Sequence, residues 1–111
     1  MAVMHSLDIT AGQRKILQDL LQKYLPGVTV WAYGSRVKGA ARKQSDLGLV
    51  VFASAKQKRL VSELKDALEE SNLPFRVDLF VWDDIPAQFR ENIQQAHVVF
   101  LADTENKDLA S

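Results

Sequence analysis

Cysteine is absent from the 111-residue sequence, which therefore can form neither disulfide bonds nor a thiolate metal site. Long hydrophobic runs are absent too, and no apolar stretch approaches the roughly 20 residues that a membrane-spanning helix requires. Residues 1–8 have no apolar core of the kind found in a secretory signal peptide. These absences predict a single domain over residues 1–111, located in the cytoplasm and not associated with a membrane.

Net charge is also missing, because 14 basic residues balance 14 acidic ones. Proteins that bind nucleic acid through its backbone need a basic surface, so we do not expect nucleic acid as a partner. A neutral chain has little repulsion between molecules, which is compatible with a protein that works in a complex. The basic side chains are nevertheless concentrated locally, since Arg36, Lys38, Arg42 and Lys43 fall within one short segment.

This basic segment separates two apolar runs. It begins with Gly34-Ser35 after the run 28–33, and it ends with Ser45-Asp46 before the run 47–52. Glycine tolerates positive φ and lets backbone N–H groups approach an anion closely. Carboxylates such as that of Asp46 are ligands that Mg²⁺ prefers. The segment thus combines groups for phosphate oxygens with a group for a divalent cation, as polyphosphate chemistry requires.

The pattern of apolar residues predicts a small α/β (α+β) fold, with a short mixed sheet and helices packed mainly on one face. Thr10 and Gln13 form a capping box before a helix over 11–25, which Pro26-Gly27 ends. Ser54 and Gln57 form a second capping box before a helix over 56–71. Strands are expected over residues 28–33, 47–53, 75–81 and 97–101.

The strands over 47–53 and 75–81 should be parallel, because the segment between them has the length of a right-handed crossover. That arrangement brings Asp46 toward Asp78. The run 47–52 is almost entirely apolar, which is typical of a central strand buried on both faces. Expected inward-facing residues are Ile16, Leu17, Leu20, Leu21, Tyr24 and Leu25 in the first helix, Leu60, Val61, Leu64, Ala67 and Leu68 in the second, and Phe89, Ile93 and Ala96 in a further helix starting near Pro86.

Asp78 lies between Val77 and Leu79, and a carboxylate among apolar residues has to be paired or bound to a cation. Arg76 falls two residues earlier on the same face of the strand, so an ion pair is one interpretation. A metal ligand that acts together with Asp46 is the other. Taken alone, Asp78 fits both interpretations, and the Gly-Ser to Ser-Asp segment favours the metal ligand.

Gly34-Ser35, ten intervening residues and Asp46 resemble the signature of the DNA polymerase β-like nucleotidyltransferases. The compact form of this motif, with Gly39 and Ser45-Asp46, is similar to the minimal nucleotidyltransferase (MNT) family. The resemblance covers nearly the whole chain. It implies that Asp46 and Asp78 are catalytic ligands of Mg²⁺, and that the nucleotide phosphates are bound by Gly34, Ser35, Arg36, Lys38 and Ser45.

The resemblance also implies an activity and a partner. The activity implied is that of an MNT-type nucleotidyltransferase, which moves AMP from ATP to a hydroxyl group, and the minimal members are often antitoxins encoded beside a HEPN-domain toxin. We therefore expect ATP as the nucleoside triphosphate, a helical HEPN-type protein as partner, and a tyrosine of that protein as acceptor. One departure concerns the second aspartate of the family motif, whose position is occupied by Gly48. Asp46 and Asp78 can hold one Mg·ATP, whereas a second ion should bind weakly or not at all.

Two functions therefore compete: an enzyme that transfers AMP, and a non-catalytic module of the same fold that holds a helical partner and ATP without turnover. The retained Gly34-Ser35, Asp46 and Asp78 favour the enzyme, whereas Gly48 and the short chain favour the module. A tRNA-modifying or nucleic-acid-binding fragment is a third candidate, but the sequence lacks the basic surface and the length. If the enzyme interpretation holds, Gly48→Asp should raise Mg·ATP affinity and the transfer rate.

Overall fold

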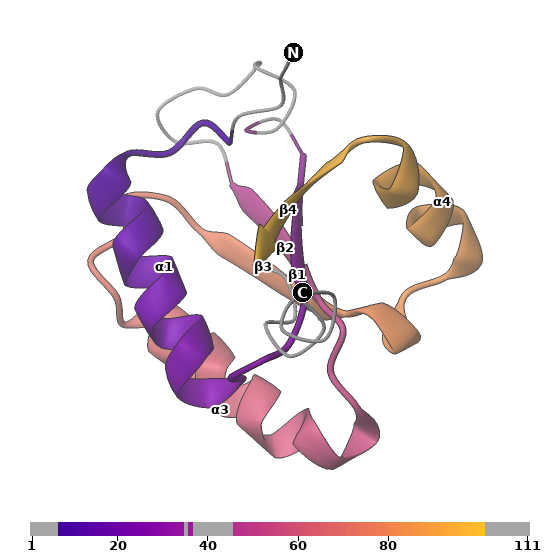
Figure 1. Ribbon diagram of the computed structural model, residues 1–111, viewed down its shortest axis with the longest axis horizontal. Coiled ribbons are helices and arrows are strands. Elements are labelled where there is room, and N and C mark those ends of the chain that lie inside the picture. The colour runs from indigo at the N-terminus through magenta and orange to yellow at the C-terminus, as the bar shows by residue number, and fades with distance from the viewer. Residues whose placement is uncertain (1–6, 35, 37–45, 102–111) are drawn as a thin grey trace, which may run out of the picture.

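A four-stranded mixed sheet forms the centre of the computed structural model, which describes residues 7–34, 36 and 46–101. The strands are β1 (Val30–Tyr33), β2 (Leu47–Val51), β3 (Val77–Val81) and β4 (His97–Leu101), in the spatial order β3-β2-β1-β4 (Figure 1). β1 pairs antiparallel with β2 and β4, and β2 pairs parallel with β3. The predicted mixed sheet is therefore confirmed, including its parallel pair.

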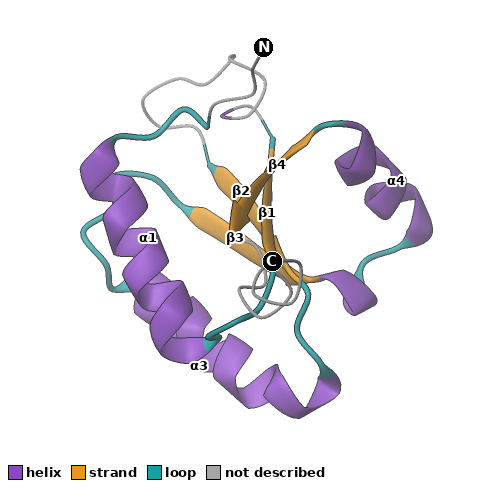
Figure 2. Ribbon diagram, in the orientation of Figure 1, coloured by secondary structure: helices purple, strands orange, loops and turns teal. Residues whose placement is uncertain are grey.

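Two helices, α1 (Ala11–Tyr24) and α3 (Lys58–Glu69), lie side by side on one face of the sheet (Figure 2). A third, α4 (Ala87–Gln95), packs against the opposite face through Ile93 and Phe89. The predicted packing of the first two helices on one face is confirmed. No helix in residues 7–34, 36 and 46–101 is long and apolar enough to cross a membrane.

Both predicted capping boxes are present. The backbone N–H of Thr10 donates to Oε1 of Gln13 at 2.9 Å, and the N–H of Gln13 donates to Oγ1 of Thr10 at 3.0 Å. The N–H of Ser54 donates to Oε1 of Gln57 at 2.8 Å, but this box opens a 3₁₀ turn, Ala55–Gln57, so the α-helix itself starts two residues later than predicted.

Three strands are shorter than predicted, and β2 ends at Val51 instead of residue 53. Val28 is still part of the turn after α1, because its N–H donates to the carbonyl oxygen of Leu25 at 3.3 Å, and β1 starts only at Val30. Phe75 is buried in the core ahead of β3, which begins at Val77. Apolar residues thus extend beyond the hydrogen-bonded strand wherever a turn also packs against the core.

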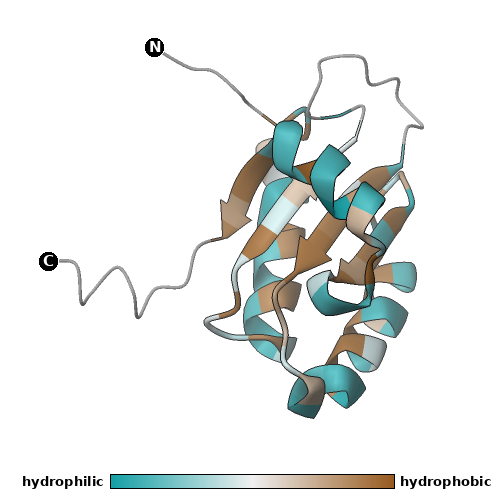
Figure 3. Ribbon diagram, turned by 90° about the vertical axis from the view of Figure 1, so that its right-hand side faces the viewer, coloured by the Kyte–Doolittle hydropathy of each residue, from teal (hydrophilic) through white to brown (hydrophobic). Residues whose placement is uncertain are grey.

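The main core lies between the sheet and the α1–α3 layer, where Leu17, Leu21 and Leu64 are fully buried. Every residue of β2 is buried, as predicted for a central strand. In Figure 3 the strands are mostly hydrophobic, whereas α4, in front of the sheet, presents mostly hydrophilic residues to the viewer.

One predicted core position is wrong. Leu60 is 38% exposed, because Val61, Leu64 and Leu68 define the buried stripe of α3 and Leu60 lies at its margin. The outer face of this helix is solvated and carries an ion pair between residues four positions apart, with Nε of Arg59 3.3 Å from Oε2 of Glu63.

Candidate functional site

The turn after β1 has the backbone conformation that the Gly-Ser motif predicts. Gly34 follows the last residue of the strand and adopts a φ of 101°, which is unfavourable for any residue with a Cβ atom. Ser35, Lys38 and Ser45, the other residues predicted to bind phosphate, lie outside the described residues. Their role therefore stays a prediction.

Arg36 supports this turn from inside the fold. Its side chain is only 6% exposed, and Nη1 donates to the carbonyl oxygen of Asp8 at 2.9 Å. The guanidinium also lies over the ring of Phe75, with 4.1 Å between Cζ and the ring centroid. The N–H of Asp8 donates back to the carbonyl oxygen of Arg36 at 2.8 Å. Arg36 therefore ties the turn to two distant segments, contacts that sequence reasoning missed, and its role in phosphate binding stays a prediction.

The register of the parallel pair places the predicted acidic residues. Gly48 in β2 pairs with Asp78 in β3, and the N–H of Leu47 donates to the carbonyl oxygen of Arg76 at 2.8 Å. Asp46 is exposed and directly precedes β2, two residues before Gly48. Since directly paired residues of adjacent strands share a face, positions 48 and 78 project from the same face of the sheet, and the same alternation carried to the residue before β2 predicts Asp46 on that face. This is the face opposite α1 and α3, because Leu47, Leu49 and Leu79 point into the main core.

Asp78 forms the ion pair that the sequence suggested. Oδ1 of Asp78 lies 2.9 Å from Nε of Arg76, whose side chain is 76% exposed, while that of Asp78 is 32% exposed. Ion pairs this open to solvent contribute about 0–1 kcal/mol to stability. Arg76 can therefore release Asp78 to a metal ion at small cost, and the two interpretations of Asp78 are compatible.

Position 48, which carries no ligand, is covered by an aromatic ring. Tyr33 is the cross-strand partner of Gly48 in the antiparallel pair of β1 and β2. A Cβ atom on Gly48 would lie 2.5 Å from Cζ and 2.6 Å from Cε2 of Tyr33. An aromatic side chain that covers a cross-strand glycine compensates for the missing glycine side chain. Sequence reasoning missed this contact, because it depends on the exact register of two strands.

The Tyr33 side chain also contacts the smaller apolar cluster under α4. Its ring stands nearly perpendicular to that of Phe89, with 5.5 Å between the centroids. Burial, and to a lesser extent the negative charge of Asp78, raise the pKa of Tyr33 to about 12. At neutral pH the hydroxyl of Tyr33 therefore carries no charge and does not replace the missing carboxylate as an anionic ligand.

We expect this raised pKa to make stability depend on alkaline pH. Because the pKa of Tyr33 is higher in the folded state (about 12) than its ordinary value of 10.0, its contribution to stability is complete below pH 10 and declines as the pH rises toward 12. The difference in phenolate absorbance between the wild type and Tyr33→Phe isolates the Tyr33 titration. Asp78→Asn should lower its midpoint, and a wild-type midpoint near 10 would contradict the environment described above.

The described residues fit one Mg²⁺ ion and do not fit two. No group of three or more His, Asp or Glu side chains that could hold a metal occurs within the described ranges. Mg²⁺ usually takes one or two carboxylates and completes its shell with phosphate oxygens and waters, which suits Asp46 and Asp78. A two-ion site needs a further carboxylate, and position 48 holds a glycine beneath the Tyr33 ring.

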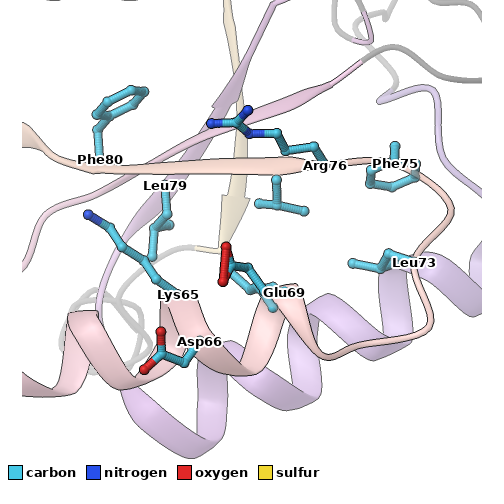
Figure 4. Close-up of a pocket in the computed structure, with 10 residues that line it drawn as sticks. Lys65, Asp66, Glu69, Leu73, Phe75, Arg76, Leu79 and Phe80 are labelled. Carbon is cyan, nitrogen blue, oxygen red and sulfur yellow. The ribbon is translucent and has the colours of Figure 1, made fainter.

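A groove of about 910 Å³ runs along the outer edge of β3, between that strand and α3 (Figure 4). Lys65, Asp66 and Glu69 line it from the helix, and Leu79 from the strand. In Figure 4, Arg76 and Phe80 project from the opposite side of the β3 ribbon. The lining includes neither Asp46 nor Asp78, but it includes Arg76, the ion-pair partner of Asp78, so this groove adjoins the acidic site.

Comparisons with known proteins agree with this geometry. The family model described as "Polymerase beta, Nucleotidyltransferase" matches residues 15–105. The Haemophilus influenzae protein named "Probable protein adenylyltransferase MntA" is 45% identical over 94 residues, which are 84% of this chain and 82% of that protein.

Two solved structures share the fold. One, described as a "putative minimal nucleotidyltransferase", matches with a TM-score of 0.62 and 28% identity, covering 78% of this chain and 88% of the other. The second is a chain of the complex between tri-AMPylated Shewanella oneidensis HEPN toxin and an MNT antitoxin, with a TM-score of 0.50, 14% identity, and 86% and 75% of the two chains covered. Since the family model spans most of the sequence and the relative is 45% identical, the chain belongs to the polymerase beta nucleotidyltransferase family.

Proposed function

We propose that the protein is an adenylyltransferase that moves AMP from Mg·ATP to a hydroxyl group of a partner protein. The observation that carries this proposal is the register of the sheet, which pairs Asp78 with Gly48, two residues after Asp46, and pairs Gly48 with Tyr33, next to the positive-φ residue Gly34. The 45% identity to a protein named as an adenylyltransferase supports the choice of AMP as the transferred group.

In the proposed reaction, the carboxylates of Asp46 and Asp78 would hold the metal ion, and the backbone at Gly34 and Ser35 would bind the β- and γ-phosphates. Lys38 and Ser45 add further donors to the phosphates, while Arg36 fixes the turn through Asp8. Mg²⁺ held by these residues would neutralise charge on the triphosphate. The acceptor oxygen forms a bond to the α-phosphorus, the bond to the β-phosphate oxygen breaks, and the acceptor proton passes to solvent as pyrophosphate leaves.

The proposed acceptor is a tyrosine hydroxyl of a helical HEPN-type toxin, which would make this chain an antitoxin. Two observations support it: the resemblance to minimal nucleotidyltransferases, and the fold shared with an MNT antitoxin whose HEPN partner is AMPylated. ATP is held in the cytoplasm, so we place the protein there.

A direct test incubates the purified protein with its cognate HEPN protein, Mg²⁺ and ATP radiolabelled at the α-phosphate. We expect label in the HEPN protein, and none when the label is on the γ-phosphate, because AMP and not phosphate is transferred. Tyrosine-to-phenylalanine variants of the HEPN protein locate the acceptor. If the two proteins form a stable complex on size-exclusion chromatography but no α-label is transferred, the enzymatic function is refuted.

That last outcome would favour the second candidate, a binding module that holds the partner without turnover. The observation in its favour is position 48, where a glycine covered by Tyr33 replaces a ligand of the family motif. A single Mg²⁺ can bring ATP to the site, but it provides no second ion for the acceptor hydroxyl. The two candidates share the partner and the nucleotide and differ only in turnover.

A further inference from the structure

Position 48 lies between two residues that the sequence places far apart. Gly48 pairs with Tyr33 on its β1 side and with Asp78 on its β3 side, so all three occupy one row across the sheet. Since directly paired residues point to the same face, a side chain at position 48 would emerge between the Tyr33 ring and the Asp78 carboxylate. The aromatic ring fills that space in the structure.

The overlap at this position is too large for small adjustments. Three ring atoms of Tyr33, Cζ, Cε2 and Cε1, would lie 2.5, 2.6 and 2.8 Å from a Cβ atom on Gly48, closer than the 3.0 Å below which such contacts essentially never occur. Because these atoms form the far end of a side chain, the ring would have to rotate away. Rotation would disturb its contact with Phe89 and the cluster of Val50, Ile85 and Ile93 beneath α4.

We propose that Tyr33 occupies the place of the missing carboxylate and thereby limits the site to the one metal ion that arrives with ATP. Tyr33 is a positioning residue in this proposal, which rests on the proposed adenylyltransferase function. Its ring prevents an acidic side chain at position 48 from reaching the space beside Asp78, and its neutral hydroxyl offers no charge to a second cation. Tyr33 and Gly48 therefore act as a pair, and changing either one alone does not create a two-ion site.

This pairing alters what is expected of Gly48→Asp. The single substitution forces the Tyr33 ring out of its packing and should not yield a second ion site. Tyr33→Val keeps a β-branched residue in the strand and clears the space above position 48. In the double variant Tyr33→Val, Gly48→Asp, the new carboxylate can lie between Asp46 and Asp78, and we expect the second ion to bind there.

Trp31→Val is the matched control. Trp31 lies on the same face of β1 as Tyr33, but it pairs with Val50 rather than with Gly48, and its ring packs on Phe52 with 4.7 Å between centroids. Trp31→Val therefore removes an aromatic ring from the same face without clearing position 48. Combining it with Gly48→Asp should not rescue that substitution.

Two measurements test the proposal on the wild type, Gly48→Asp, Tyr33→Val, the double variant and the Trp31 controls. The first is Tm without metal or nucleotide, which reports only the steric conflict between the Tyr33 ring and a side chain at position 48. The second is the number of Mn²⁺ ions bound per chain, from the electron paramagnetic resonance of free Mn²⁺, with α,β-methylene-ATP as a nucleotide that cannot transfer AMP.

We expect Gly48→Asp to lower Tm by about 5 °C or more, and the double variant to be more stable than the sum of the two single changes predicts. The wild type and Gly48→Asp should bind one Mn²⁺ with the nucleotide, and the double variant two. AMP transfer should then rise about 10-fold or more in the double variant only, since even indirect partners of metal ligands change activity by about 10–100-fold.

Gly48→Asp with wild-type Tm and two bound Mn²⁺ ions would overturn the proposal, as would a double variant that still binds one ion. Additive Tm changes would show that Tyr33 and position 48 do not compete for space. If no variant binds Mn²⁺ or the nucleotide, both the proposed adenylyltransferase function and the predicted number of bound ions are wrong. The Tm measurements distinguish that result from a failure of the steric argument, because they involve neither metal nor nucleotide.

Discussion

Asp78→Asn is expected to reduce AMP transfer by about 100-fold or more while the protein stays folded. Asn has nearly the shape of Asp but no negative charge, so Mg²⁺ would lose one of its two carboxylates. Changes to residues that merely orient metal ligands cost about 10–100-fold, and the loss of a ligand should cost at least as much. Stability should change little, because the ion pair that Asp78 loses involves a largely exposed Arg76.

Two control variants separate the role of Asp78 as a ligand from its role in the ion pair. Arg76→Gln removes the same ion pair but keeps the carboxylate, so it should retain transfer. Asp84→Asn changes an exposed acid beyond the end of β3 and should behave like the wild type. Transfer rates and urea denaturation are compared for the three proteins. If Asp78→Asn transfers AMP at the wild-type rate, Asp78 is not a ligand of the proposed site. If Arg76→Gln loses as much transfer activity as Asp78→Asn, the ion pair and not the metal accounts for the loss.

The parallel pairing that sets Asp78 beside β2, two residues after Asp46, could be predicted from the sequence because the decisive signals are local. The apolar run of β2 and the length of the crossover through α3 determine a parallel pair. In such a pair the starts of both strands lie at the same edge of the sheet. The alternation of side chains then places both acids on one face. No contact between distant residues had to be known.

The contacts of Tyr33 and Arg36 could not be predicted in this way. Tyr33 covers Gly48 only because β1 and β2 pair in one register, and a shift of one residue would turn the ring to the other face. Arg36 is buried because Asp8, which precedes it by 28 residues, and Phe75, which follows it by 39 residues, converge on its guanidinium. A basic residue in a glycine-containing loop looks the same in the sequence whether it faces a phosphate or the core.

Helical periodicity gave the direction of the buried stripe in α3 but not its width. Leu60, Val61, Leu64 and Leu68 all fit a helical pattern, and only the last three are buried. A helix on the surface of a sheet buries roughly a third of its circumference, so residues at the margin of the stripe are decided by the neighbouring elements. Leu60 is such a residue, and it provides a control for the final prediction.

Leu64→Ala is expected to lower the free energy of unfolding by about 2–5 kcal/mol, because a fully buried leucine loses its contacts and leaves a cavity. Leu64 is 0% exposed and lies in the same core cluster as Leu17 and Leu21 of α1. Domains of this size have about 5–15 kcal/mol of total stability, so the variant should be markedly easier to unfold with urea.

Leu60→Ala makes the same chemical change one turn earlier in the same helix. Because Leu60 is 38% exposed, we expect a cost below about 1 kcal/mol, with helix propensity favouring alanine slightly. The difference between the two variants therefore measures burial, since residue type, substitution and helix are shared. Equal destabilisation by both substitutions would mean that Leu60 is covered in solution, and that the buried stripe of α3 is wider than the structure shows.

AMP transfer by folded Leu64→Ala at low temperature should stay near the wild-type rate, because Leu64 lies on the face of the sheet opposite to Asp46 and Asp78.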